Sequence, residues 1–164
     1  MADLLQSNEI FFTAFEPKVQ NRFIMYLDGI PSFLIKKTDR PKITAAAKEL
    51  DHINIQRKYR GKSKWDDIAI TLYDPIVPSG AQAVMEWIRL HHESVTGRDG
   101  YSDFYKKDVT INVLGPVGDK VEEWTLKGAF ISGTTNFGSL EWNNDGDFIP
   151  IELNLSMDYC ILQF

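Results

Sequence analysis

The fold is decided by one stretch near the C-terminus, Ile149-Pro150-Ile151-Glu152-Leu153-Asn154-Leu155-Ser156-Met157-Asp158-Tyr159. Its apolar and polar residues alternate, and alternation with a period of two is typical of a β-strand with one buried face. The odd-numbered positions form the apolar face and the even-numbered positions form the other. We therefore expect one face of this strand to meet a hydrophobic core and the other to meet water or a water-filled space.

The residues upstream of this stretch predict two further strands. One spans residues 109–113 and the other spans residues 121–132, with a turn at residues 115–119 between them. The residues expected on one face of the longer strand are Trp124, Leu126 and Phe130. A further turn is predicted at Asn143-Asn144-Asp145-Gly146, immediately before the decisive strand.

Two β-hairpins are predicted in the N-terminal half. The first runs through residues 22–36 and turns at Asp28-Gly29, a strong turn dipeptide. The second runs through residues 53–72 and turns around Gly61. The residues before it are irregular, so residues 39–64 as a whole are expected to form an extended loop and a hairpin.

One helix is predicted, at about residues 79–94. Ser79 follows Pro78 and is a suitable N-cap. The residues expected on its buried face, at i, i+3, i+4 and i+7, are Val84, Trp87, Ile88 and His91. Many strands with one helix predict a mainly β fold of two packed antiparallel sheets, a sandwich or partial barrel, with the helix covering an end or edge. Without repeats or a low-complexity linker, residues 1–164 are expected to form a single domain, with residues 1–15 available as an extended arm.

The composition limits the function classes. The 164 residues are 43% hydrophobic and 12% aromatic, which suits a chain that buries its own core. The net charge of −5 argues against a protein that grips nucleic acid through a basic surface. Cys160 is the one cysteine, so an internal disulfide is excluded. We expect neither a secretory signal nor a membrane-spanning segment, since no apolar run approaches the roughly 20 residues that a span needs.

The acidic pairs and the histidines do not predict an active site. Adjacent residues of a strand point to opposite faces, so neither Asp66-Asp67 nor Glu122-Glu123 converges on one bond, and we expect these carboxylates to be solvated. His91-His92 lacks the i, i+4 spacing of helical metal ligands. A calcium loop that starts at Asn143 would need glycine at position six and glutamate at position twelve, where the sequence has Phe148 and Asn154. No histidine is placed to activate Cys160. We therefore predict no catalytic residues, no metal site and no cofactor.

One local charge feature stands out, the basic run of residues 57–64. Its members are Arg57, Lys58, Tyr59, Arg60, Lys62 and Lys64. Three interpretations are open: a solvated hairpin tip that guards a strand edge, a contact with an acidic surface of another subunit, and a nucleic-acid contact. The overall acidity of the chain favours the first two.

Four segments give the sequence a family resemblance: residues 21–38, the 57–64 run leading into Trp65–Asp74, the helix around Val84–Ile88, and the final strand ending at Tyr159. In order and length they resemble the tail tube proteins of contractile-tailed bacteriophages, over most of the chain. Two departures are an apolar tail at residues 160–164 and an apolar N-terminal stretch.

The resemblance implies a structural protein and not an enzyme. It implies hexameric rings in which strands of neighbouring subunits complete a continuous inner β-barrel, and stacked rings that form a tube inside a contractile sheath. The partners implied are further copies of the chain, the sheath protein, and baseplate and tail-terminator proteins, with no membrane insertion. Genomic DNA would pass through the lumen without specific binding. The implied location is the virion tail, assembled in the host cytoplasm. The tubes of type VI secretion and other contractile injection systems share this fold, so the particle type stays open.

The predicted site residues follow from this resemblance and from the alternation of the strands. The expected subunit or ring interface comprises Arg57, Lys58, Tyr59, Arg60, Lys62, Lys64, Phe11 and Phe12. The expected lumen-facing residues are Asn54, Gln56, Thr71, Glu152, Asn154 and Asp158. The alternative from a different class is a ligand- or carbohydrate-binding β-sandwich module that uses exposed Trp65, Tyr101 and Trp142.

Overall fold

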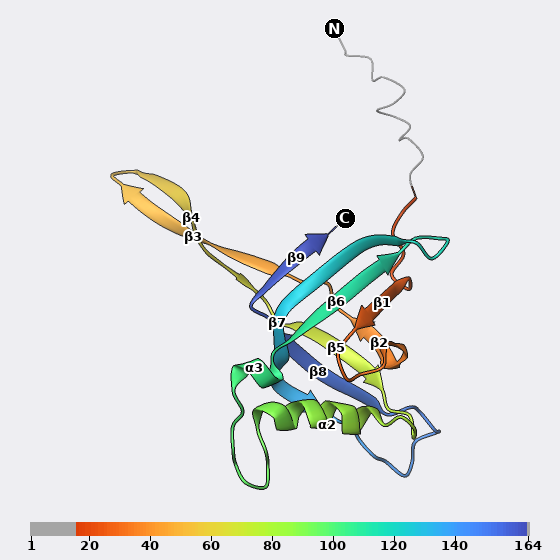
Figure 1. The fold of residues 1–164 in the computed structure, drawn as a ribbon. Coiled ribbons are helices and arrows are strands. Elements are labelled where there is room, and N and C mark those ends of the chain that lie inside the picture. The colour runs from red at the N-terminus through yellow and green to blue at the C-terminus, as the bar shows by residue number, and fades with distance from the viewer. Residues whose placement is uncertain (1–15, 164) are drawn as a thin grey trace.

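The computed structural model describes residues 16–163, and strands dominate its architecture (Figure 1). The strands are β1 (Phe23–Tyr26), β2 (Ile35–Thr38), β3 (Ile43–His52), β4 (Ile55–Trp65), β5 (Ile68–Tyr73), β6 (Lys107–Leu114), β7 (Lys120–Asn136), β8 (Pro150–Ser156) and β9 (Tyr159–Gln163). The helices are the 3-10 turn η1 (Ser32–Leu34), α2 (Gly80–His91) and the short α3 (Ser102–Tyr105). Within these residues, no helix has the length and apolar character needed to cross a membrane.

Strand β7 joins two antiparallel sheets. Its first part pairs with β6 and β9, and β6 continues the sheet to β1. Its last part pairs with β8, and that sheet continues through β5 to β2. Gly128 lies where β7 leaves one sheet for the other, with φ of +64°. A Cβ there would lie 2.1 Å from a carboxylate oxygen of Asp158, so the bend requires glycine.

The core lies between the two sheets and beneath α2. Its fully buried side chains include Met25, Ile68, Leu72, Ile111, Leu126, Ile151, Leu153 and Leu155. The buried members of β8 alternate as the sequence predicted, with Ile151, Leu153 and Leu155 inside and Glu152 outside. The prediction of a mainly β fold with two packed antiparallel sheets and one substantial helix is confirmed.

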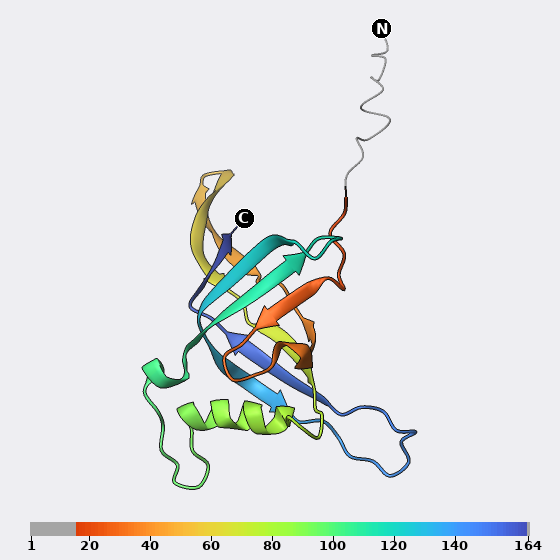
Figure 2. The same cartoon turned by 45° about the vertical axis from the view of Figure 1, so that its right-hand side comes forward.

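Helix α2 begins where predicted and ends three residues earlier than expected. The Ser79 hydroxyl accepts a hydrogen bond from the backbone N–H of Gln82 at 3.3 Å. Val84 and Trp87 are buried, and the Trp87 indole N–H donates to the backbone carbonyl of Tyr105 at 2.8 Å. The helix, which lies below the sheets in Figure 2, therefore packs through the face that its periodicity indicated.

The first predicted hairpin is wrong. The chain does turn at Asp28-Gly29, where Leu27 and Ile30 form an isolated bridge. However, β1 pairs with β6 and β2 pairs with β5, so the two strands belong to different sheets. Leu27 and Ile30 are buried on either side of the turn. The turn therefore packs on the core, and the strands before and after it lie on different sides of that core.

The second predicted hairpin has its turn in the wrong place. The chain reverses at Ile53-Asn54, and β4 pairs with β3 instead of β5. Gly61 lies inside β4 at a register shift, where a Cβ would lie 2.9 Å from the carbonyl oxygen of Ala46. The low β-propensity of Ala45-Ala46-Ala47 concealed β3, since cross-strand pairing decides strand formation more than propensity does.

The predicted face of β7 is correct only up to its bend. Trp124 and Leu126 lie on the core side, but Ala129 and Ile131 are the buried residues beyond Gly128, and Phe130 is only partly buried. An irregularity at the bend shifts the alternation by one position, which moves the following side chains to the opposite face.

Candidate assembly surfaces

The β3–β4 hairpin projects from the body of the molecule (Figures 1 and 2). It pairs only within itself as a separate two-stranded sheet among the described residues. Every residue of β3 and the first six residues of β4 are exposed to solvent. The interface residues Arg57 to Lys64 predicted from sequence all lie on β4 and so belong to this projection.

The two faces of the hairpin differ in character. Directly opposed residues of an antiparallel pair share a face, so the register assigns each side chain. One face carries Glu49, Gln56 and Lys58, which are joined by an ion pair at 3.2 Å and a hydrogen bond at 2.8 Å to the Glu49 carboxylate. The opposite face carries exposed apolar side chains with two basic residues: Lys48, Leu50, Ile55, Arg57 and Tyr59. At the tip, Ile53 is 90% exposed.

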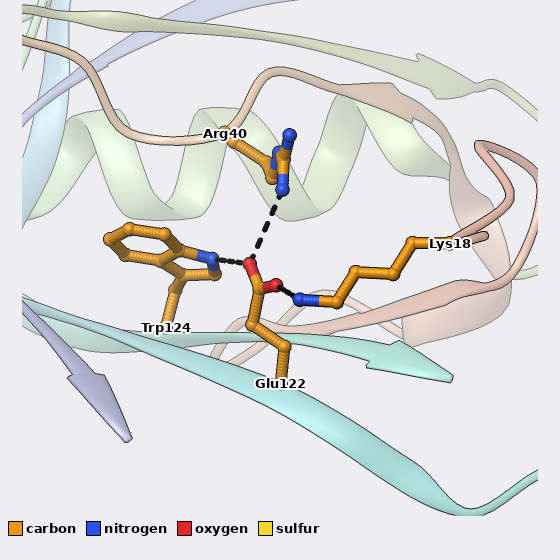
Figure 3. A network of polar contacts seen from close by, with 4 residues as sticks. All are labelled: Lys18, Arg40, Glu122 and Trp124. Atoms are coloured by element: carbon orange, nitrogen blue, oxygen red, sulfur yellow. Dashed lines mark hydrogen bonds and ion pairs between the residues drawn. The ribbon is translucent and has the colours of Figure 1, made fainter. Parts of the chain in front are cut away.

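A buried carboxylate anchors the root of the hairpin (Figure 3). The Glu122 side chain, on β7, is only 6% exposed and receives an ion pair from Lys18, a hydrogen bond from the Trp124 indole N–H and the Arg40 guanidinium at 3.4 Å. Lys18 belongs to the segment before β1, and Arg40 to the segment that leads into β3. Glu122 therefore ties the base of the hairpin and the N-terminal segment to the same strand.

The ionisation of Glu122 reflects this environment. Burial by itself raises the pKa of the carboxyl group, but hydrogen bonds from Lys18 and Trp124 and the charges of Lys18 and Arg40 outweigh it. Its pKa therefore lies below the ordinary value, and the group is ionised at neutral pH. The expectation of a solvated Glu122 is wrong. The sequence did hold a signal, because Glu122 has the same strand parity as the core-facing Trp124 and Leu126.

Three of the predicted lumen-facing residues lie together on one polar sheet face. Thr71 of β5 is directly opposite Glu152 of β8, and Asn154 is opposite Ser132 of β7. None of the three belongs to the core. The hydroxyls of Ser132 and Ser156 lie 2.8 Å apart and both donate to Asp67, which extends the polar surface.

The other three predicted lumen residues lie elsewhere. Asn54 and Gln56 are on the projecting hairpin. Asp158 lies between β8 and β9 and pairs with Lys106 at 2.8 Å. Phe11 and Phe12, predicted for the interface, lie outside the described residues.

Residues 159–163 form β9, a strand that was not predicted. It pairs with β7 through Glu123↔Gln163 to Lys127↔Tyr159. Cys160 packs against the core from this strand, and burial raises the pKa of its thiol to about 11, so the thiol is protonated at neutral pH. The signal was the apolar run Cys160-Ile161-Leu162, which is long enough for an edge strand.

The residues considered for chemistry are dispersed. His92 contacts Asp99 at 2.8 Å on an exposed loop, and His91 packs edge-on against Tyr105. Among residues 16–163, no group of three or more His, Cys, Asp or Glu side chains is arranged to hold a metal. Trp142 and Tyr101, considered for a binding module, are exposed at separate loops, and Trp65 is partly buried at the hairpin root.

Comparison with known proteins finds similarity in structure. No protein-family model and no curated protein matches the sequence. A chain from the tube-terminating cap of the anti-feeding prophage superposes with a TM-score of 0.74 at 17% identity, covering 96% of this chain and 99% of that chain. A chain from the sheath–tube complex of PVC, an extracellular contractile injection system in its extended state, gives 0.69 at 20% identity, covering 90% and 91%. A type six secretion system protein gives 0.50 at 9% identity, covering 86% and 82%.

The TM-scores of 0.74 and 0.69 show a shared fold. The coverage spans nearly the whole of this chain in the first two comparisons. As the resemblance in its sequence predicted, the chain has the fold found in the tube cap and sheath–tube complex of contractile injection systems and in a type six secretion protein.

Proposed function

We propose that this chain is a structural subunit that assembles with copies of itself into hexameric rings, which stack into the inner tube of a contractile tail. The observation that carries the proposal is the β3–β4 hairpin, which leaves the core with its apolar side chains exposed. An isolated two-stranded hairpin is marginally stable in water. A contact with another subunit would bury these side chains and add to the stability of the hairpin.

Open strand edges support the same proposal. Within residues 16–163, β1, β2 and β9 each have one pairing neighbour. An unpaired edge presents backbone N–H and C=O groups to another chain. Pairing of such edges around a ring removes them and leaves a closed assembly, with apolar burial adding to the driving force.

The expected partners follow from the tube role. They are further copies of the chain, a contractile sheath, and baseplate and terminator proteins, with assembly in the cytoplasm of the host. The likeness to chains from a tube cap and a sheath–tube complex supports a place in such a particle. In a bacteriophage tail the tube would conduct DNA into the host cell. In a type VI or other contractile injection system the same tube would serve that machine instead.

The polar face formed by Thr71, Glu152 and Asn154 is proposed as part of the lumen wall. Lysine and arginine side chains would bind the phosphate groups of DNA. A lumen wall without a basic patch therefore lets DNA slide past. Assembled tubes of the wild-type protein should therefore not retain DNA in low salt. Tubes of a Glu152→Lys, Asn154→Lys variant should retain it in a co-sedimentation assay. If the lysine tubes release DNA as freely as the wild type, this face does not line the channel.

Negative-stain electron microscopy across protein concentration and salt tests the function directly. Hollow rings or uniform tubes are expected. Small particles at every concentration, together with binding of a sugar in a ligand screen, would favour the β-sandwich binding module instead.

A basic-run variant tests the hairpin as an assembly surface. Replacing Arg57, Lys58, Arg60, Lys62 and Lys64 with Ser should leave the monomer folded, as judged by circular dichroism, and impair tube growth. Raising the salt concentration should weaken wild-type assembly in the same direction, because exposed charges are screened. Normal tubes from this variant would remove the basic run from the interface.

A further inference from the structure

A second exposed apolar surface is formed by α2 and the segment that connects β7 to β8. These elements lie at the opposite end of the molecule from the hairpin (Figures 1 and 2). The surface centres on an open groove of about 630 Å³ between α2 and the segment that connects β7 to β8. Ala81 and Met85 of α2 form one wall, and Phe137, Leu140 and Ile149 form the other. Asp74 and Arg89 also line the groove, so its walls are close to neutral.

The segment of residues 137–149, named here the acidic loop, borders this groove. It contains Glu141, Asp145 and Asp147 and no basic residue, so its net charge is −3. It also exposes Leu140, Trp142 and Phe148, and the Trp142 side chain is fully exposed to solvent. An exposed group of large apolar side chains on the surface of a protein is typical of an interaction site.

Local contacts give the acidic loop a defined shape. The Asn144 side-chain oxygen accepts hydrogen bonds from the backbone N–H groups of Gly146 at 3.1 Å and Asp147 at 2.9 Å. At its base, a Cβ on Gly138 would lie 2.6 Å from the Ile149 side chain, so the two ends of the loop pack closely. The exposed residues therefore lie on a loop that has a hydrogen-bonded turn and two closely packed ends.

The hairpin is complementary to this surface in charge and polarity. Residues 43–65 contain six Lys or Arg residues and two acidic ones, a net charge of +4, which leaves the rest of the chain at −9. The apolar face of the hairpin adds Leu50, Ile55 and Tyr59 beside Lys48 and Arg57. A basic apolar projection thus matches a nearly neutral apolar groove bordered by an acidic loop, and complementary charge steers and orients such a contact.

The two surfaces of one chain cannot meet each other, because the body of the molecule separates them in both views (Figures 1 and 2). A contact between them must join two copies. It uses different patches on the two partners, and such a heterologous contact repeats from copy to copy into a ring or a stack.

We propose that the groove beside α2 and the acidic loop together receive the tip of the β3–β4 hairpin of a neighbouring copy. This inference rests on the proposed self-assembly and names the two surfaces that meet. Leu50, Ile53 and Ile55 of one copy pack against Leu140 and Trp142 of the next. Lys48 and Arg57 face the carboxylates of the acidic loop.

Cysteine cross-linking between two variants tests the contact. Both variants carry Cys160→Ser, which removes the native thiol. One adds Ile53→Cys on the hairpin and the other adds Trp142→Cys on the acidic loop. The matched control replaces the second variant by Val117→Cys, an equally exposed apolar position on the turn between β6 and β7. Equal mixtures are oxidised, and mass spectrometry of the peptides measures the mixed disulfide, while electron microscopy of the same samples records assembly.

The outcomes separate this inference from the proposed function. A 53–142 disulfide at least tenfold above the 53–117 control supports the contact. Rings or tubes with no excess of the 53–142 disulfide overturn the hairpin receptor and leave the self-assembly standing. If neither rings or tubes nor the 53–142 disulfide form, both the hairpin contact and the proposed self-assembly are overturned. The disulfide in particles no larger than dimers supports the contact and contradicts the tube.

A charge exchange provides a second measurement. Lys48→Glu with Arg57→Glu should reduce assembly, and so should Glu141→Lys with Asp147→Lys. All four substitutions in one chain should restore assembly. A failure of the combined variant to recover, with its monomer folded, would show that these charges do not face each other.

Discussion

The body of the molecule and its projecting hairpin are both antiparallel sheet, but different forces hold them. In the body, β5 and β8 bury one complete face, with Ile68, Leu153 and Leu155 inside. In the hairpin, β3 buries no residue, and its order comes from the strand ladder and the anchored root. The body is therefore stabilised by its own core, whereas the exposed hairpin is the region for which a contact with a neighbouring copy is proposed. Four changes can break or sharpen this comparison.

The largest difference is expected between two leucine truncations. Leu155→Ala removes a fully buried side chain and should lower the free energy of unfolding by about 2–5 kcal/mol, because it leaves a cavity. Leu50→Ala makes the same change on the exposed hairpin and should cost about 0.5 kcal/mol or less. Urea denaturation of dilute, unassembled protein measures both. Equal losses would show that the hairpin packs on its own subunit.

Leu50→Ala should act on assembly much more than on the monomer. Burial of a leucine contributes about 1.5–3 kcal/mol, so the protein concentration needed for assembly should rise at least about tenfold. Sedimentation velocity across concentration measures this shift. Val117→Ala, at an exposed position outside the hairpin and the groove, serves as the control. Assembly of Leu50→Ala at wild-type concentration would exclude this face from the interface.

Glu122→Gln tests the anchor between the two regions. It keeps the shape of the side chain but removes the charge that faces Lys18 and Arg40, and should cost about 1–3 kcal/mol of unfolding free energy at pH 7. Glu123→Gln is the matched control. Glu123 is adjacent to Glu122 in the chain, but its carboxylate is less buried and pairs with Lys120 at the surface. A loss no larger than that of the control would mean that the network contributes little.

The same variant gives a pH dependence with a defined sign. The pKa of Glu122 is lowered in the folded protein, so its contribution is fully present above the ordinary value of 4.5 and is lost as the pH falls through the lowered pKa. The stability difference between wild type and Glu122→Gln should therefore be constant near neutrality and shrink in acid. Denaturation midpoints between pH 7 and pH 3 measure it. A difference that grows in acid would contradict the assignment.

The smallest effect is expected on the polar face of the hairpin. Glu49→Gln removes an exposed ion pair with Lys58, and should change the unfolding free energy by less than about 0.5 kcal/mol. It should also leave the assembly concentration unchanged, because the proposed contact uses the opposite face. A large loss of assembly in sedimentation experiments would reassign the interface to this face.

The parts of the fold that sequence could predict are those with strong periodicity. The alternation from Ile149 to Tyr159 predicted β8 and its buried residues, and the 3.6-residue spacing with Ser79 predicted α2. The strand over Ala45–Lys48 was missed because alanine carries little information about strands. Its formation depends on pairing with β4, the next strand in the chain, and no glycine marks the turn at Ile53-Asn54 that joins the two strands.

The candidate surfaces divide in the same way. Sequence located the basic run and the polar face of the final strand, because charge and alternation are local properties. It did not reveal that the basic run projects from the body, or that residues 137–149 expose their apolar side chains beside α2. Both depend on where the rest of the chain leaves a side chain uncovered.

Local sequence pattern was enough to predict the strand-rich class, the single substantial helix, the main core residues and the charge contrast between residues 57–64 and the rest of the chain. The pairing of the strands, the bend of β7 at Gly128 and the burial of Glu122 beside Lys18 and Arg40 became visible only in the folded chain. Hydrophobic periodicity is a local property that can be read within a short window of sequence. Sheet pairing and burial depend mostly on contacts between segments distant in the chain.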